Sequence, residues 1–296
     1  MRVTFGSTFR NGLLDVNQAA ERLAQRTREM GSGKKLQAPS DDPGAMAGAI
    51  NERAEMGALD QYIRTNDSAE SRLTVADSAL TDIIRQITAA QGRGVAGRST
   101  ILSQTQRDAM AQEIRGSRDA ILRGINTQAA GAYLFSGGQA STPAYDPGPP
   151  ISGYQGDART NEVDVARGRA VQVTFDGQRI IQGTAANDLF TTLTTLADAV
   201  QTGNMAGIDS AMGELALGFD RVTTAQSGIG IELGSFAGDR ARTSELRRAA
   251  DKRRSGFEDA NLAEAISAAE QAEQAHRAAL GALGTAGRLS LMDYLK

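Results

Sequence analysis

The chain has 296 residues, enough for one large domain or two modest ones that each bury a substantial core. Only 4% of the residues are aromatic and tryptophan is absent, so the core must use small and aliphatic side chains, which suits closely packed long helices. A net charge of -3 gives no electrostatic reason to expect nucleic acid or an anionic membrane as a partner. With one histidine and no cysteine, the chain can form neither a disulfide nor a Cys/His zinc site of its own.

Two features concern where the protein resides. No segment approaches the roughly 20 consecutive apolar residues of a membrane-spanning helix, and residues 1–12 lack the apolar run of a signal peptide. Taken alone, these features predict a cytoplasmic protein. Secretion by a route that cleaves no signal peptide would leave the same sequence, so both possibilities stay open.

Proline positions divide the chain into segments. All six prolines lie within residues 39–43 or 143–150, so the remainder can form long helices. Apolar residues recur there at steps of three and four, which places them on one face of a helix. Such stripes cover residues 13–30 before Gly31 and Gly33, residues 73–90 before Gly92, residues 110–128, and residues 189–200 after a capping Asn187 or Asp188.

The most regular pattern lies in the C-terminal half. From Ile208 to Phe236 the stripe alternates steps of four and three without interruption, a 3.5-residue repeat typical of helices that coil around one another. We therefore predict a mainly α fold. Long antiparallel helices from the N- and C-terminal regions form a coiled coil or bundle, and a small β-rich domain is inserted between them.

The character of the sequence changes between Thr142 and Gly183, where prolines and glycines separate short runs of β-forming residues. These runs predict strands at Glu162–Val165, Arg169–Phe175 and Arg179–Ile181. The Asp176-Gly177 dipeptide between the last two predicts a hairpin turn.

Two motifs with possible chemistry have simpler interpretations. Residues 92–97 fit the dinucleotide fingerprint GxGxxG, but they follow a helical stripe instead of a strand, so we expect a turn between two helices and no cofactor. Asp41 and Asp42 are paired carboxylates, but Asp42 before Pro43 also fits the start of a helix, and capping is the favoured interpretation.

The remaining polar features suggest no catalytic or metal site. His276 lies in an alanine-rich helical segment with no nucleophile motif nearby, so we expect a residue on the helix surface. Seven basic residues between Arg240 and Arg254 predict a solvated helix face, with ion pairs between subunits as the second possibility and nucleic acid as the third. We predict no catalytic, cofactor-binding or metal-binding residues, and no enzyme.

The two chain ends are unusually apolar. Chain ends are commonly polar and frayed, so apolar ends indicate either docking onto the body or a surface that another copy covers. The first helix is short, and the alanine-rich residues 257–286 bury little apolar area, so neither end is expected to be stable alone. We predict a subunit-assembly interface formed by Phe5, Phe9, Leu13, Leu14, Val16, Leu23, Leu262, Ile266, Leu280, Leu283, Leu289, Leu291, Tyr294 and Leu295.

Three segments resemble a known family. Residues 33–43 (GKKLQAPSDDP) resemble an element near the N-terminus of bacterial flagellin-like proteins. Residues 131–137 (GAYLFSG) resemble an element of the hook-associated proteins of the FlgL type, which form the hook-filament junction. Residues 289–295 are similar to the apolar tail of the family. The resemblance covers about residues 1–140 and 187–296.

This resemblance implies an extracellular component of the bacterial flagellum, exported through the type III apparatus without a cleaved signal peptide. It implies an adaptor that joins hook-associated proteins to the flagellin filament. The expected partners are copies of the chain in a ring or helical layer, a hook-associated junction protein on the hook side, flagellin on the filament side and an export chaperone. Nucleic acid and membranes are not expected.

The resemblance also implies a division into domains. Residues 1–40 and 257–296 form the terminal assembly region, residues 41–140 and 187–256 a helical rod, and residues 141–186 an outer β-rich insert. Two alternatives remain: a compact filament-forming flagellin, and a helical signalling or scaffolding rod of the bacterial cytoplasm.

Overall fold

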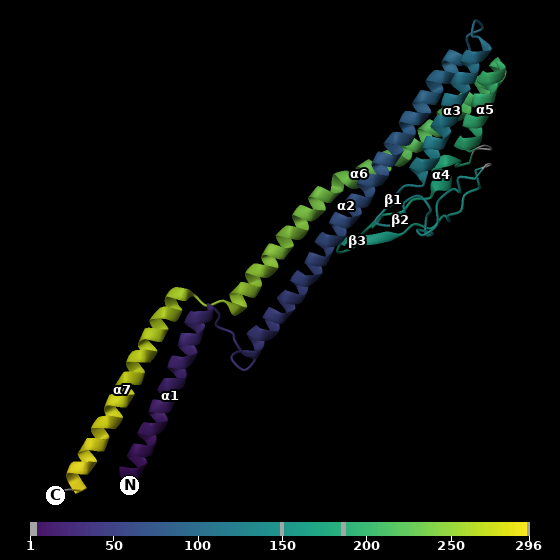
Figure 1. Cartoon of the computed structure of the whole chain (residues 1–296). Helices are drawn as coiled ribbons and strands as arrows, with labels where there is room; N and C mark the ends of the chain where they lie inside the picture. Colours follow the sequence, from purple (N-terminus) through teal and green to yellow (C-terminus); the bar gives the residue numbers. More distant parts are fainter. Residues whose placement is uncertain (1–4, 149–150, 185–187, 295–296) are drawn as a thin grey trace. The chain divides into compact units, whose positions relative to one another are not determined.

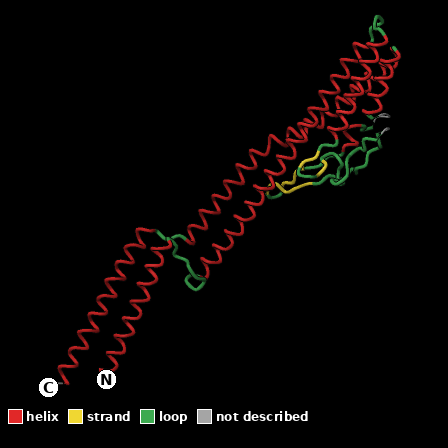
Figure 2. Tube along the Cα trace, in the orientation of Figure 1, coloured by secondary structure: helices red, strands yellow, loops and turns green. Residues whose placement is uncertain are grey.

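The computed structural model describes residues 5–148, 151–184 and 188–294 (Figure 1). These residues form seven helices and two small antiparallel sheets of two strands each (Figure 2), which confirms the predicted mainly α fold with a small β region. The chain divides into two compact units, residues 1–57 with 247–296 and residues 58–246. Whether the insert of residues 141–186 is a separate domain stays a prediction.

The first unit contains both terminal helices. Helix α1 (Phe5–Ser32) and helix α7 (Leu262–Tyr294) lie side by side and run in opposite directions (Figure 1). Gly33, at a φ of 66°, ends α1 in the left-handed conformation that glycine adopts at low cost. The unit also includes the start of helix α2 (Pro43–Gly97) and the end of helix α6 (Met205–Glu258).

The start of α2 agrees with the capping interpretation. Asp42 accepts a hydrogen bond from the Ala45 amide at 2.9 Å, and Pro43 occupies the first helical position. Asp41 accepts bonds from the amides of Gln37 and Ala38, and these bonds lower the pKa of its carboxyl group. Both carboxylates therefore stabilise the approach to α2.

The second unit is a helical bundle with the β-rich segment attached. Helix α3 (Gln104–Ile125) and helix α5 (Leu189–Thr202) pack side by side and share a core with α2 and α6. Ser103 and Gln106 form a capping box at the start of α3, and Asp188 caps α5 through the Thr191 amide. No helix among the described residues is both long and apolar enough to cross a membrane.

The heptad pattern of α6 corresponds to its buried seam. Every seventh residue of the stripe is buried, while the intervening stripe positions are half-buried. The five buried residues are Ile208, Leu215, Val222, Ile229 and Phe236.

The prediction of a turn at residues 92–97 is wrong. These residues are the last turns of α2, and the turn follows at residues 98–103. A β-carbon on residue 94 would lie 2.6 Å from the Met212 sulfur, and one on residue 97 would lie 2.8 Å from a Val200 methyl carbon. The glycines therefore allow close packing within the helix and do not end it.

The β-rich segment contains two hairpins. Strand β1 (Gln128–Ala129) pairs with β2 (Ala132–Tyr133), and β3 (Glu162–Ala166) pairs with β4 (Arg169–Gln172).

The strand predicted at Arg179–Ile181 and the hairpin turn at Asp176-Gly177 are wrong, because residues Gly177–Ile181 form helix α4. Asp176 caps this helix by accepting bonds from the amides of Gln178 and Arg179, so the same polar residue starts a helix where a turn was expected.

Candidate assembly surface

The interface between α1 and α7 is built from small side chains. Its buried residues are alanines, flanked by a few half-buried aliphatic residues. The buried set is Ala19, Ala265 and Ala269, and the half-buried set includes Val16, Leu23 and Leu283. Because alanine removes little apolar area from water, the hydrophobic contribution of this helix pair is small.

Larger apolar side chains on both helices remain exposed to solvent. Six of them have between 39% and 55% of their surface accessible: Phe9, Leu13, Leu14, Leu262, Ile266 and Leu280. Isolated exposed apolar residues are common on proteins, so their significance depends on whether they gather in one place.

Helix geometry places five of the six on one face of the pair. Each residue of an α-helix is rotated by about 100° about the helix axis from the residue before it. By this geometry, Phe9 and Leu13 point roughly 50 to 100° away from the direction in which α1 faces α7. On α7, Leu262, Ile266 and Leu280 point away from the contact with α1 by a similar angle, and the rotation about the helix axis has the same sense. For antiparallel helices, equal offsets in the same sense point to the same side, so we call these five residues the apolar face. Leu14 lies roughly 180° around α1 from the contact between the helices, so it points away from α7.

The predicted interface residues therefore divide into groups. Val16, Leu23 and Leu283 are half-buried on the two helices, whereas the apolar face and Leu14 are exposed. The remaining predicted residues lie outside the residues whose side chains the structure describes: Phe5, Leu289, Leu291, Tyr294 and Leu295. The pattern of large apolar residues could not reveal that the helix contact itself uses alanine.

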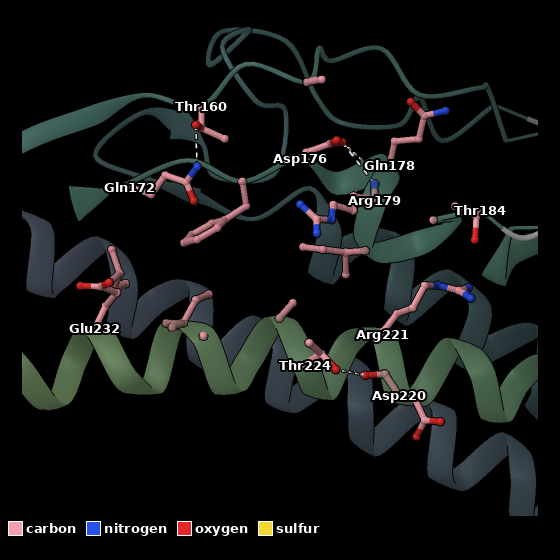
Figure 3. A pocket seen from close by; sticks show the side chains of 18 of the residues that line it. Thr160, Gln172, Asp176, Gln178, Arg179, Thr184, Asp220, Arg221, Thr224 and Glu232 are labelled. Atoms are coloured by element: carbon pink, nitrogen blue, oxygen red, sulfur yellow. Dashed lines mark hydrogen bonds between the residues drawn. The ribbon is translucent and has the colours of Figure 1, made fainter. Parts of the chain in front are cut away.

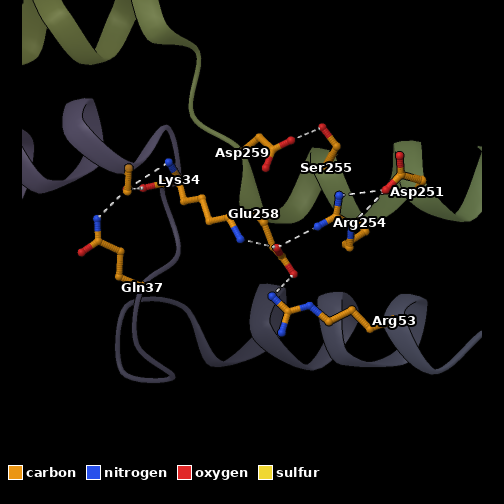
Figure 4. Close-up of polar contacts among 9 residues, drawn as sticks. Lys34, Gln37, Arg53, Asp251, Arg254, Ser255, Glu258 and Asp259 are labelled. Atoms are coloured by element: carbon orange, nitrogen blue, oxygen red, sulfur yellow. Dashed lines mark hydrogen bonds and ion pairs between the residues drawn. The ribbon is translucent and has the colours of Figure 1, made fainter. Parts of the chain in front are cut away.

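A buried carboxylate lies where α6 ends (Figure 4). The side chain of Glu258 is only 2% exposed and pairs with three cations. Its Oε1 lies 2.7 Å from Arg53 of α2, and its Oε2 lies 3.5 Å from Lys34 and 3.4 Å from Arg254. Arg254 also contacts Asp251 at 2.8 Å.

The electrostatics of Glu258 keep it ionised. Burial by itself raises the pKa of the carboxyl group, because a charged group loses hydration. The hydrogen bond and charge of Arg53, followed by those of Lys34, lower it by more, so the pKa lies below its ordinary value. Glu258 is therefore a permanent anion at neutral pH.

Backbone hydrogen bonds connect the same two parts of the chain. The Lys35 amide donates to the Glu258 carbonyl at 2.8 Å, and the Ala260 amide donates to the Gly33 carbonyl at 2.8 Å. The Lys35 ammonium group also reaches the Gly256 carbonyl. We call this site the connector joint: residues 33–36, Arg53, Arg254 and residues 256–260. Its sequence signal, the Gly-Lys-Lys tripeptide, gave no indication of a partner more than 200 positions away.

The second unit has an open groove of about 1430 Å³ between α6 and the β-rich segment (Figure 3). Phe175, Arg179 and Arg221 are among the residues that line it. Two of its acidic groups have structural roles, since Asp176 caps α4 and Glu232 pairs with Arg169. Among the described residues, no three His, Cys, Asp or Glu side chains come together as a metal site would require.

Five of the seven basic residues between Arg240 and Arg254 are exposed, as a solvated helix face requires. Arg240 pairs with Asp67 at 3.3 Å, Arg253 with Glu52 at 2.8 Å, and Arg254 belongs to the connector joint. Part of the run therefore forms ion pairs within the chain. His276 lies on helix α7 and is half-buried.

Residues 10–140 match the model of the bacterial flagellin N-terminal helical region. The chain is 23% identical over 276 residues to flagellar hook-associated protein 3 of Salmonella typhimurium, covering 83% of this chain and 86% of that protein. It is 24% identical over 216 residues to the Escherichia coli protein of the same name, covering 73% and 67%.

Solved structures of such proteins have the same fold. A putative flagellar hook-associated protein from Vibrio parahaemolyticus has a TM-score of 0.69 and 21% identity, covering 74% of this chain and 100% of its own. The flagellar junction protein FlgL of Legionella pneumophila has a TM-score of 0.60 and 11% identity, covering 72% and 100%. The predicted resemblance to flagellin-like, hook-associated proteins is confirmed.

Proposed function

We propose that the chain is a structural adaptor of the bacterial flagellum that joins hook-associated proteins to the flagellin filament. The observation that carries the proposal is the apolar face on α1 and α7, in a chain similar to hook-associated protein 3 over 83% of its length. A face of this kind gains stability only when another molecule covers it. The role is structural, without catalysis.

The proposed partners follow from an adaptor's position between two different lattices. Copies of the chain form a ring or layer through the apolar face, with a hook-associated protein on one side and flagellin on the other. The protein resides outside the cell, reaches that place without a cleaved signal peptide, and is held by an export chaperone beforehand.

A compact filament-forming flagellin is the alternative, because it would share the flagellin-type region of residues 10–140. The relatives described above carry the name hook-associated protein 3, which favours the adaptor. Purified protein added to filament fragments should stop after a single layer if it is an adaptor. Continued growth into long filaments would support flagellin instead.

Localisation provides the direct test. Antibody labelling of detached flagella should mark a single band at the boundary between hook and filament. Labelling along the whole filament would support flagellin, and absence from sheared flagella would exclude both roles. The last result would favour a rod of the cytoplasm.

A further inference from the structure

We propose that Glu258 is a positioning residue for assembly, which locks the α1–α2 connector (residues 33–42) to the α6–α7 connector (residues 259–261). Both terminal helices are then attached through one joint and not through two independent hinges. The role in assembly rests on the proposed function, whereas the lock itself can be measured in the dilute monomer.

The side-chain contacts converge from separate parts of the chain. Lys34 belongs to the first connector, Arg53 to α2 and Arg254 to α6, and all three reach the carboxylate of Glu258 (Figure 4). One buried anion thus holds two segments that are 224 positions apart in sequence. No other single side chain of the joint connects as many elements among the described residues.

The backbone bonds depend on this arrangement. The Lys35 amide donates to the Glu258 carbonyl, and the Ala260 amide donates to the Gly33 carbonyl, so two backbone hydrogen bonds link the two parts of the chain. Phe257 packs against α2 beside the joint, because a β-carbon on Gly48 would lie 2.9 Å from its ring. These bonds are few and near the surface, so they need the side-chain lock to persist.

Burial distinguishes Glu258 from ordinary ion pairs of the same helices. The Arg240–Asp67 pair also links α6 to α2, but its side chains are 55% and 45% exposed, and such pairs contribute little. Glu258 is 2% exposed, so its charge interactions are screened far less. The Arg240–Asp67 pair therefore supplies a matched control.

Removing the charge should loosen the joint without unfolding the protein. Arg53 and Lys34 are 53% and 44% exposed, so water can solvate them when the carboxylate is lost, and Arg254 keeps Asp251. With Glu258→Gln, the connectors should move separately. Each assembling subunit must then lose that extra freedom, which weakens assembly.

The absence of native cysteine makes the lock measurable by paired spin labels. One pair, Ala24→Cys with Asn51→Cys, spans the α1–α2 connector, and another, Lys252→Cys with Gln274→Cys, spans the α6–α7 connector; all four positions are exposed. The parent should give narrow distance distributions. Glu258→Gln should broaden both pairs, while Asp67→Asn should broaden neither.

Two outcomes would overturn the lock: unchanged distributions in Glu258→Gln, or broadening of only one pair, which would indicate independent hinges. Should Glu258→Gln unfold the first unit outright, Lys34→Gln provides the same test, since it removes the tie to the α1–α2 connector while Arg53 and Arg254 still pair with the buried carboxylate. In that variant too, both pairs must broaden.

Binding to hook or filament ends tests the role in assembly. We expect Glu258→Gln to bind about tenfold more weakly than the parent, a ratio equivalent to about 1.4 kcal/mol. If the parent itself does not bind, the proposed function fails. If the parent binds and Glu258→Gln binds equally well, only the positioning role fails.

Discussion

Gly12 of α1 lies directly against Leu283 of α7. A β-carbon on residue 12 would come within 2.9 Å of a Leu283 methyl carbon, closer than real β-carbons approach other atoms. This contact fixes how near the two terminal helices can lie, and their interface accordingly uses alanine at its buried positions.

A bulky side chain at residue 12 should separate the helices. We expect Gly12→Leu to increase amide exchange in both α1 and α7, because the leucine cannot fit unless Leu283 and its helix move. Gly281→Ala is the matched control on α7, since a β-carbon there meets nothing within 4 Å. The control should stabilise its helix by about 0.5 to 1 kcal/mol. Equal exchange in Gly12→Leu and the parent would contradict the packing argument.

The terminal helices should be the least protected part of the isolated monomer. Their contact buries mainly alanine, whereas α3 and α5 bury Ile114, Ile121, Leu193 and Leu196 completely. Hydrogen exchange of the dilute protein should therefore be much faster for residues 5–30 than for α3 and α5. Strong protection of residues 5–30 under these conditions would mean that the pair is stable without an assembly partner.

The long helices could be predicted from the sequence because burial follows the heptad spacing. Ile208, Leu215 and Val222 lie seven residues apart, and each is buried. The glycines of α2 misled the interpretation, since glycine near a helix end usually signals a stop. At Gly94 and Gly97 the reason for glycine is a neighbouring side chain, which the sequence alone cannot place.

The candidate site was predictable only in part. Leu13 and Ile266 belong to recognisable apolar ends, but which face each would present depends on the alanine contact between α1 and α7. The connector joint could not be predicted, because nothing local to Lys34 or Glu258 marks them as partners. Contacts between distant segments follow from the topology and not from residue spacing.

The buried seam of α6 allows a matched comparison of two isoleucines. Ile229 is 2% exposed and Ile231 is 74% exposed, on the same helix two positions apart. Ile229→Ala should lower the free energy of unfolding by about 2 to 5 kcal/mol, since it leaves a cavity. Ile231→Ala should change it by less than about 0.5 kcal/mol. Urea unfolding followed by circular dichroism measures both, and similar losses would contradict the assignment of the seam.

Acid should remove the contribution of Glu258. Its pKa in the folded chain lies below the ordinary value of 4.5, so unfolding raises its affinity for protons. The stabilisation is therefore complete well above pH 4.5 and disappears as the pH falls through the lowered pKa of the folded state. The parent should melt at a higher temperature than Glu258→Gln at pH 7, and the difference should shrink below pH 4.5. A difference that grows in acid would contradict this sign.

The apolar face should be needed for assembly but not for folding. Ile266 and Leu280 are 41% and 48% exposed, so changing both to glutamine removes little buried area from the monomer. We expect unchanged melting of the dilute protein and loss of binding to hook or filament ends, because a polar group would be buried against the neighbouring subunit. Ile231→Gln, an exposed change on α6, is the control and should bind normally. Normal binding by the Ile266→Gln/Leu280→Gln variant would show that the contact between subunits lies elsewhere on the chain.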